Sequence, residues 1–417
     1  MPKKNLRGSN INLVKLHNLQ VVLLSLLYEP GLSRIQLAER TNLSSTTITN
    51  LIAELKAQGV ISEHDNGAEE PNPRSVGRPR VGIRLIPDSR FAVGVHIGIG
   101  IFRIAVANLE DHILHNKVFE YDTQLPAQAV LEQIRDGIET VIQESGVDRA
   151  RIVGVGIGAS GLVDFASGVN LLAPNLNWRD VPMRGFFQDA LNLPVVVDNN
   201  VRAMAIGEAF FGAGRGVNSL AFVYGRTGVS AGLVFNGRVF RGSSTGAGEI
   251  GHTVMLLHGG DPCHCGNTGC LETLVSEPAI LRQAEALARL HPGGILAATI
   301  RTRQDVPMLE RVFTAAREGD EDVRRMLNER AYYLGLALAN VVNLFNPELI
   351  LLGGIFSQGQ DLFIEPTLAT VRSMSFGGLG TKVRLQATTF GWKAGVTGAA
   401  ALALMHFFYQ PEEGASS

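Results

Sequence analysis

The 417-residue sequence has only three cysteines and no apolar run long enough to cross a membrane. A membrane-spanning helix requires roughly 18 or more consecutive apolar residues. The chain begins Met-Pro-Lys-Lys-Asn and lacks the apolar segment and cleavage site of a secretory signal. We therefore expect a protein that has no membrane association and lies in the cytoplasm.

All three cysteines fall within eight residues, at Cys263, Cys265 and Cys270. Random placement would cluster them this tightly on the order of one time in a thousand, so the spacing requires a cause. His252 precedes the first cysteine by eleven residues. One imidazole and three thiolates form a closed tetrahedral ligand set, and soft sulfur ligands favour zinc over magnesium or calcium. The sequence therefore predicts a structural zinc site.

Two alternatives to this ligand set remain at the level of sequence. The three cysteines could instead be buried free thiols. His264 is a rival histidine, but it lies between two ligand cysteines, where one residue can hardly point inward together with both neighbours. We therefore assign the fourth ligand to His252. Cysteines that bind metal instead of forming disulfides also fit a reducing cytoplasm.

The charge is distributed unevenly along the chain. The net charge is −2, but residues 1–86 contain eleven Lys and Arg against seven Asp and Glu, a balance of +4 that leaves −6 on the remainder. The length suggests two or three domains, and the hydrophobic fraction of 45% can fill their cores. A basic N-terminal part on an acidic body points to nucleic acid as a partner.

The N-terminal part contains the signals of a helix-turn-helix. An apolar segment ends before Glu29-Pro30-Gly31, which stops a helix. Ser33 and Gln36 form a capping box that opens the next helix, and Ser44 caps a third helix that stops at Gly59. The expected helices are residues 21–28, 34–41 and 45–58.

The third of these helices has two different faces. Its apolar residues recur at i, i+3, i+4 and i+7, which predicts one buried stripe. They are Ile48, Leu51, Ile52 and Leu55. The opposite face carries short hydrogen-bonding side chains near the helix N-terminus, as in helices that read operator DNA in the major groove. These are Ser45, Thr46, Thr47, Thr49 and Asn50.

A two-stranded wing is expected after the third helix, from residues 60–63 and 81–86. The polar tip between them carries Arg74, Arg78 and Arg80, and Gly77-Arg78-Pro79 resembles the minor-groove element of AT-hooks. The sequence thus predicts a winged helix-turn-helix that binds DNA through helix and wing. The alternative is a helical hairpin that only docks on the body.

From about residue 91 the sequence changes to glycine-rich apolar segments that alternate with helical ones. Residues 91–98 and 102–107 are typical of a hairpin. Further strands are expected at residues 153–157, 195–197, 220–224 and 231–235, and helices at residues 127–144 and 326–344. Strands mixed with crossover helices predict an α/β body, and its length of more than 300 residues favours two lobes.

Several motifs of this body are specific. They are Gly-Val-Gly-Ile-Gly-Ala-Ser-Gly-Leu-Val-Asp (154–164), Ala-Pro-Asn-Leu-Asn-Trp (173–178), Gly-Glu-Ile-Gly-His (248–252), the Cys-x-Cys-Gly-x-x-Gly-Cys-Leu-Glu segment (263–272) and Leu-Leu-Gly-Gly (351–354). On these motifs, residues 86–417 resemble the ROK family (repressors, open reading frames and kinases). The winged N-terminus extends the resemblance to ROK repressors, of the xylose-repressor type.

The resemblance implies an actin-like, sugar-kinase-type fold of two lobes behind the DNA-binding domain. We expect a winged helix-turn-helix in residues 1–86, a first lobe in 87–199 with 392–417, and a second lobe with the zinc loop in 200–391. The sugar-binding residues that the resemblance implies are Asn175, Asn200, Glu249, His252 and Glu272. Carboxylates and amides make directional hydrogen bonds to sugar hydroxyls, and the metal would orient the loop that carries the acids.

Two departures from the ROK kinases predict loss of catalysis. His96 stands where the kinases have the aspartate of an Asp-x-Gly motif, which binds nucleotide phosphate and magnesium. Asn200 stands where they have the general base, and an amide has no useful basicity at neutral pH. The loop 225–228 also lacks the small residue usual before Thr-Gly. Asp198 could act as a shifted base only if the register slipped by two residues.

The favoured interpretation is a sugar-responsive transcriptional regulator that represses carbohydrate-utilisation genes, binds operator DNA and acts as a homodimer or homotetramer. An alternative is an ATP-dependent sugar kinase of ROK type with an appended DNA-binding domain. A further alternative is a body that binds a protein partner. Xylose, glucose and N-acetylglucosamine all remain possible effectors, and the sequence leaves inducer and co-repressor action open.

Overall fold

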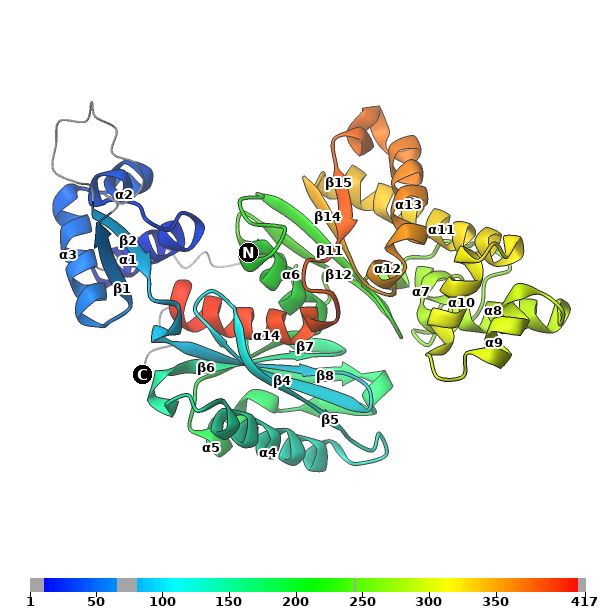
Figure 1. The fold of residues 1–417 in the computed structure, drawn as a ribbon, viewed down its shortest axis with the longest axis horizontal. Coiled ribbons are helices and arrows are strands. Elements are labelled where there is room, and N and C mark those ends of the chain that lie inside the picture. The colour runs from blue at the N-terminus through cyan, green and yellow to red at the C-terminus, as the bar shows by residue number, and fades with distance from the viewer. Residues whose placement is uncertain (1–10, 66–80, 244, 412–417) are drawn as a thin grey trace, which may run out of the picture. The chain divides into compact units, whose positions relative to one another are not determined.

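The computed structural model describes residues 11–65, 81–243 and 245–411 (Figure 1). The chain divides into two compact units. The first comprises the residues up to Asp198 together with those from Ala399 onward, and the second comprises Asn199–Gly398. Within the described residues, no helix is both long and apolar enough to cross a bilayer.

The first unit opens with a winged helix-turn-helix, as the sequence predicts. Its elements are α1 (Ile11–Tyr28), α2 (Arg34–Thr41), α3 (Ser45–Ala57), β1 (Ile61–Asp65) and β2 (Val81–Leu85). The capping box at Ser33 and Gln36 is present with both of its hydrogen bonds, and the Ser44 side chain caps α3. Gly59 has φ +67°, the left-handed conformation that ends a helix.

The expected apolar stripe of α3 forms part of a small core. Ile48, Leu51, Ile52 and Leu55 are all buried. Strands β1 and β2 pair antiparallel, with Ile61 opposite Leu85, and so form the wing. Glu63 of β1 accepts hydrogen bonds from Lys56 of α3 and Arg34 of α2. These hydrogen bonds lower the pKa of Glu63, and the contacts fasten both helices to the wing.

Helix α1 begins ten residues earlier than the sequence predicts. Residues 11–20 contain Lys15, His17 and two asparagines, which made this stretch look unlike the apolar segment that follows. Tertiary contacts favour the longer helix: Lys15 forms an ion pair with Glu54 of α3, and Gln20 donates to the carbonyl of Pro411.

The rest of the first unit is a sheet in the order β10-β6-β3-β4-β5, in which β3 pairs parallel with β6 and antiparallel with β4. The strands are β3 (Phe91–Ile97), β4 (Ile101–Asn108), β5 (Ile113–Glu120), β6 (Ile152–Ala159) and β10 (Val195–Asn199). Helices α4 (Ala127–Ser145) and α5 (Met183–Leu191) lie on one face and residues from Ala399 onward on the other (Figure 1). Gly156 of β6 allows the segment from Ala399 onward to lie against the sheet, because a Cβ there would lie 2.0 Å from the Ala399 carbonyl oxygen.

A small second sheet follows β6 in the first unit. It has the order β7-β8-β9, from β7 (Leu162–Asp164), β8 (Val169–Ala173) and β9 (Trp178–Val181). The sequence prediction did not include these strands or β5. In β5, burial alternates between partly exposed and exposed positions, so its residues provide little apolar signal.

The second unit is built on a sheet in the order β13-β12-β11-β14-β15. The strands are β11 (Ser219–Gly225), β12 (Val229–Phe235), β13 (Arg238–Val239), β14 (Leu349–Gly354) and β15 (Arg384–Ala387). The helices are α6 (Asn200–Phe211), α7 (Leu271–Val275), α8 (Glu277–Leu290), α9 (Ile295–Thr302), α10 (Met308–Arg317), α11 (Glu321–Phe345), α12 (Ile355–Gln358), α13 (Gln360–Met374) and α14 (Ala394–Leu404), whose last residues belong to the first unit.

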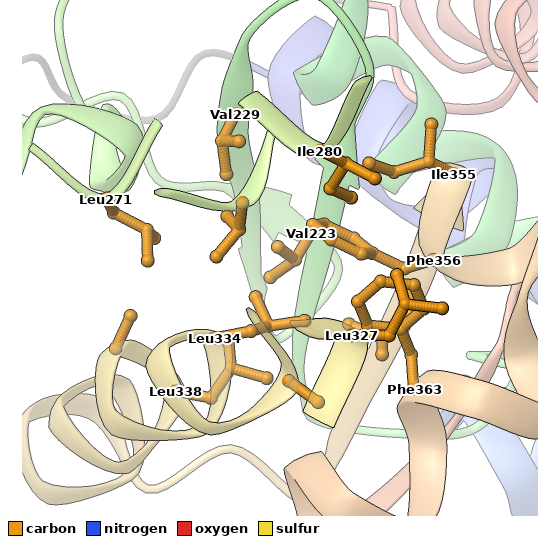
Figure 2. Close-up of a cluster of buried hydrophobic side chains, with 14 of the residues drawn as sticks. Val223, Val229, Leu271, Ile280, Leu327, Leu334, Leu338, Ile355, Phe356 and Phe363 are labelled. Carbon is orange, nitrogen blue, oxygen red and sulfur yellow. The ribbon is translucent and has the colours of Figure 1, made fainter. Parts of the chain in front are cut away.

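Two layers of helices enclose this sheet. On one face, Gly232 allows α6 to approach β12, because a Cβ there would lie 2.6 Å from the Ala205 side chain. On the other face, Val223 and Val229 join side chains of α7, α8, α11, α12 and α13 in one apolar cluster (Figure 2). Leu271 of α7 belongs to this cluster, so the end of the cysteine-containing segment is anchored in the core. The predicted α/β body is thus confirmed.

Candidate functional site

The site in the second unit begins with two glycines that bring a loop against β12. A Cβ on Gly248 would lie 1.9 Å from the Ala231 carbonyl oxygen, and one on Gly251 would lie 2.1 Å from that of Val229. Gly248 also has φ +96°, a conformation that favours glycine. The close backbone approach therefore requires both glycines. It places the residues between and after them, Glu249 and His252, beside β12.

The cysteine segment folds into a compact loop after His252. The N–H of Cys263 donates to the Asn267 carbonyl oxygen at 2.8 Å, and Gly266 makes the turn with φ +95°. The loop brings His252 and the three cysteines together, with one potential ligand atom from each within 4.8 Å of all the others. This group can hold a metal ion, as the sequence analysis expects.

The sulfur atoms of this cluster lie close to one another and to the His252 ring. The Cys265 and Cys270 sulfurs lie 3.7 Å apart, and the Cys263 sulfur lies 3.5 Å from His252 Nδ1. Burial together with the neighbouring thiols raises the pKa of Cys270 to about 12, and burial also raises the pKa of Cys263. The backbone N–H of Asn267 lowers the pKa of Cys265. A second negative charge at such distances is unfavourable without a cation.

His264 lies next to the cysteine cluster and faces Glu272. Its Nδ1 is 3.2 Å from Glu272 Oε1. The other oxygen, Oε2, accepts a hydrogen bond from the Val229 N–H at 2.9 Å. Gly228 provides the space for this carboxylate, because a Cβ there would lie 2.8 Å from Oε2. Glu272 is 7% exposed, and its two oxygens face different neighbours, the His264 ring and the Val229 N–H.

Glu249 is the second acid of the site. Burial raises its pKa, and His252 and Arg202 act in the opposite direction. Arg202 of α6 is 2% exposed and donates to the Thr245 carbonyl oxygen at 2.7 Å, which ties α6 to the loop that leads to Glu249. Sequence reasoning missed Arg202, because no spacing in the sequence relates it to an acid 47 positions later.

The candidate residues of the kinase-like motifs lie at element ends or inside strands. Asn200 is the first residue of α6, and the side chain of Asn199 caps that helix by accepting from the N–H groups of Val201 and Arg202. Asp198 is fully buried at the end of β10. His96 is 7% exposed in β3, in register opposite Arg103 of β4.

Asn175 belongs to the first unit, whereas the other four candidate sugar-binding residues belong to the second. It is exposed in the short 3₁₀ helix Pro174–Leu176, which connects β8 to β9. Gly161, with φ +98°, allows its loop to lie directly against the end of β8, because a Cβ there would meet the Leu172 carbonyl oxygen at 2.4 Å. The Gly-Leu-Val-Asp part of the motif thus supports the segment that carries Asn175.

The candidate DNA-binding residues of α3 differ in whether their side chains make hydrogen bonds within the helix. Ser45, Thr46, Thr49 and Asn50 are exposed. Thr47 is only partly exposed, and its N–H and hydroxyl both contact the Ser44 side chain in the helix cap. Thr49 donates its hydroxyl to the Ser45 carbonyl oxygen. Among the five, Asn50 therefore retains the largest free hydrogen-bonding group.

The wing candidates Arg74, Arg78 and Arg80 lie outside the described residues. The described part of the wing adds an arginine that sequence reasoning missed. Arg84 of β2 is exposed and lies beside Gly31 at the turn between α1 and α2. The sequence could have indicated Arg84, because it lies on a predicted wing strand, two residues before the expected end of that strand.

Comparison with known proteins matches both parts of the chain. A family model described as ROK family matches residues 92–406, and a model described as winged helix-turn-helix DNA-binding matches residues 18–62. The chain belongs to the ROK family. This ROK protein therefore has the two-lobed actin-like body behind a winged helix-turn-helix, as the sequence predicts.

Relatives of this ROK protein include regulators and kinases. The xylose repressor of Caldicellulosiruptor bescii is 30% identical, over 97% of this chain and 99% of its own length. A crystal structure of a ROK family transcriptional regulator, a homologue of the E. coli MLC protein, is 29% identical with a TM-score of 0.82 and covers 95% of this chain and 97% of its own. The glucokinase of Halalkalibacterium halodurans is 32% identical, over 74% of this chain and 93% of its own length.

We expect Gly251→Ala to destabilise the second unit by about 1–3 kcal/mol, because the added methyl group overlaps the Val229 carbonyl oxygen. Gly185→Ala is the matched control: Gly185 lies in α5 with no atom within 4 Å of its Cβ position, so alanine there should be neutral or stabilising by up to about 1 kcal/mol. Thermal unfolding of both variants measures the difference. Equal stability of the two would contradict the close approach at β12.

Proposed function

We propose that this ROK protein is a sugar-responsive transcriptional repressor of carbohydrate-utilisation genes. The observation that carries the proposal is the extent of similarity. The xylose repressor matches this chain from the winged helix-turn-helix through the body, over 97% of its length, whereas the glucokinase matches 74%. The helix-turn-helix binds operator DNA, and the body binds the sugar.

In this proposal five side chains hold the sugar by hydrogen bonds. Asn175, Asn200, Glu249, His252 and Glu272 contact its hydroxyl groups. Two features of the geometry support these roles: the acids flank the candidate metal-binding loop, and Glu272 is buried while Glu249 is partly buried. A carboxylate withdrawn from water makes charge-assisted hydrogen bonds that discriminate between hydroxyl positions.

We assign zinc to the cluster of His252, Cys263, Cys265 and Cys270. Around a tetrahedral zinc ion with Zn–S bonds of about 2.3 Å and a Zn–N bond of about 2.0 Å, two sulfurs are about 3.8 Å apart and sulfur and nitrogen about 3.5 Å apart. The distances of 3.7 Å between Cys265 and Cys270 and 3.5 Å between Cys263 and His252 agree with both values. When bound, zinc would hold the loop from His252 to Cys270 in one conformation.

Catalysis is proposed to be lost in this body. His96 and Asn200 replace the aspartates expected from the ROK kinases. Asn200 begins α6 and can donate or accept a hydrogen bond, but it cannot take a proton from a sugar hydroxyl at neutral pH. Asp198 offers no shifted base in support of catalysis, because its side chain has no exposed surface.

Residues 1–86, 87–199 with 392–417, and 200–391 would act as DNA-binding domain, first lobe and second lobe. The working form would be a cytoplasmic homodimer or homotetramer, because paired helix-turn-helix domains read half-sites about one helical turn apart. Asn50 of α3, with Ser45, Thr46 and Thr49, would face the major groove, and Arg74, Arg78 and Arg80 would contact DNA from the wing. Sugar binding would change operator affinity through a coupling of about 1–3 kcal/mol.

The proposal is tested by selecting binding sites from random DNA and titrating them with and without sugars found by thermal shift. We expect paired half-sites whose affinity changes when the sugar binds. Asn50→Ala should relax the preference for one base in each half-site, at a cost of about 1–3 kcal/mol. Glu249→Ala should bind the same DNA but lose the sugar response.

The two variants serve as controls for each other, because Asn50 lies on the exposed face of α3 and Glu249 lies in the second unit. Each should affect one activity and leave the other intact. DNA binding that is insensitive to every sugar in the wild type would contradict the repressor proposal. A full sugar response in Glu249→Ala would show that the sugar site lies elsewhere.

Cys263→Ser should lower both the zinc content and the sugar affinity, since the metal orders the loop between the two acids. Elemental analysis of the purified protein should give one zinc per chain for the wild type and much less for the variant. Calorimetry gives the sugar affinity of the same samples. Native protein without zinc would overturn the assignment, and unchanged sugar affinity in zinc-free protein would separate the metal from the sugar site.

A sugar kinase with an appended DNA-binding domain is the second candidate, and the 32% identity to a glucokinase favours it. We expect no phosphorylation of hexoses or pentoses in a coupled assay for ADP with ATP and magnesium. Asn200→Asp alone should not restore it, because His96 still replaces the phosphate-side aspartate. Turnover at ordinary kinase rates, roughly 1–100 per second, would establish the kinase instead.

A further inference from the structure

The histidine between the first two cysteines lies against an acid of the candidate sugar site. His252, His264 and Glu272 form a second group, with one potential ligand atom from each within 4.8 Å of the others. His264 lies outside the four-residue cysteine cluster, and its Nδ1 lies 3.2 Å from Glu272 Oε1. A carboxylate only accepts hydrogen bonds, so a hydrogen bond between these two atoms requires the proton on Nδ1. His264 remains partly open to solvent, with 44% of its side chain exposed, whereas the Glu272 side chain is 10% exposed. The histidine therefore covers an acid that is otherwise enclosed by protein.

Both ends of this contact are fixed. On one side, the neighbours of His264 are Cys263 and Cys265, and the Cys263 N–H closes the loop onto Asn267. On the other side, Leu271 anchors the start of α7 in the apolar core, in the cluster that also contains Val229 (Figure 2). The Val229 N–H, which holds Glu272 Oε2, belongs to the same core strand.

The two donors restrict which directions remain open on the carboxylate. A carboxylate offers about four lone-pair sites, two on each oxygen. The Val229 N–H occupies one site on Oε2, and the His264 ring lies beside Oε1. Gly228 leaves space beside Oε2, because a Cβ at this position would lie 2.8 Å from that oxygen. With a different neighbour at each oxygen, the carboxylate is held in one orientation relative to β12.

We propose that His264 is a positioning residue that fixes the Glu272 carboxylate for sugar binding and thereby determines which hydroxyl configuration the site prefers. This inference rests on the proposed function, in which Glu272 accepts hydrogen bonds from the sugar. An acceptor with fixed lone pairs makes a strong hydrogen bond to a hydroxyl on one side of the sugar ring and only a weak one to the same hydroxyl in the epimer. A carboxylate that rotates freely accepts from both.

The test measures affinity for glucose, for its C2 epimer mannose and for its C4 epimer galactose, and for xylose and N-acetylglucosamine, by calorimetry. His264→Ala should weaken binding of the preferred sugar about tenfold, as expected for loss of a partner that orients a ligating group. The ratio of affinities between preferred sugar and epimer should fall by a similar factor. The metal content should not change, because His264 contributes no ligand to the cysteine cluster.

His264→Asn is the conservative variant, because the asparagine side-chain nitrogen takes nearly the position of Nδ1 and donates a hydrogen bond. It should recover most of the affinity and of the epimer preference. If His264 only supported the fold of the loop, the hydrogen-bond donor of asparagine would not restore affinity and epimer preference. Gly228→Ala approaches Glu272 from the opposite side, at the 2.8 Å contact with Oε2, and should reduce epimer preference with His264 intact.

Glu272→Ala separates failure of this inference from failure of the proposed function. If Glu272→Ala abolishes binding while His264→Ala retains both affinity and epimer preference, Glu272 is a sugar ligand and the positioning role of His264 is wrong. If His264→Asn behaves like His264→Ala, the donated hydrogen bond is not the cause. If Glu272→Ala binds normally, or the wild type binds none of the five sugars, the sugar site itself has been misplaced and both proposals fall.

Discussion

The candidate site depends on the close approach of one backbone segment to strand β12. Gly248 and Gly251 have no room for a Cβ against the carbonyl oxygens of Ala231 and Val229, so the chain can follow the strand only with glycine at both positions. This contact fixes Glu249 and His252, which follow these glycines or lie between them. The same strand holds Glu272 through the Val229 N–H. A single strand thus organises both acids and one of the candidate metal ligands.

The candidate metal ligands and the two acids are close together in the sequence. Cys270 is two residues from Glu272, and Leu271 between them is buried in the core of the second unit. The segment from Cys270 to Glu272 is held on one side by apolar packing and on the other by the cysteine loop. We therefore expect a small shift of that loop to move the Glu272 carboxylate. The candidate metal ligands and the candidate sugar-binding acid are therefore parts of one local structure.

The same scaffold serves proteins named as kinases and as repressors. At the start of α6, Asn200 follows the capping side chain of Asn199, so the first residue of this helix is an amide. An amide still exchanges hydrogen bonds with a hydroxyl group.

The sequence by itself determined the elements whose signals are local. The caps at Ser33 and Ser44, the stripe of α3 and the grouping of the three cysteines all arise from residues within a few positions of one another. The wing strands and His252 pair with partners about ten to twenty-five positions away. The family resemblance then supplied the acids and the two-lobed body. Strands such as β5 and β7 were not foreseen, because their short or mixed patterns have no apolar period of their own.

Only the tertiary structure decided which distant groups meet. Glu272 accepts from Val229, 43 residues earlier, and buried Glu208 accepts from Thr388, 180 residues later. His264, which the sequence treats only as a rejected metal ligand, lies with its Nδ1 3.2 Å from Glu272 Oε1. Such contacts depend on how strands and loops pack in three dimensions, and no spacing along the chain encodes them.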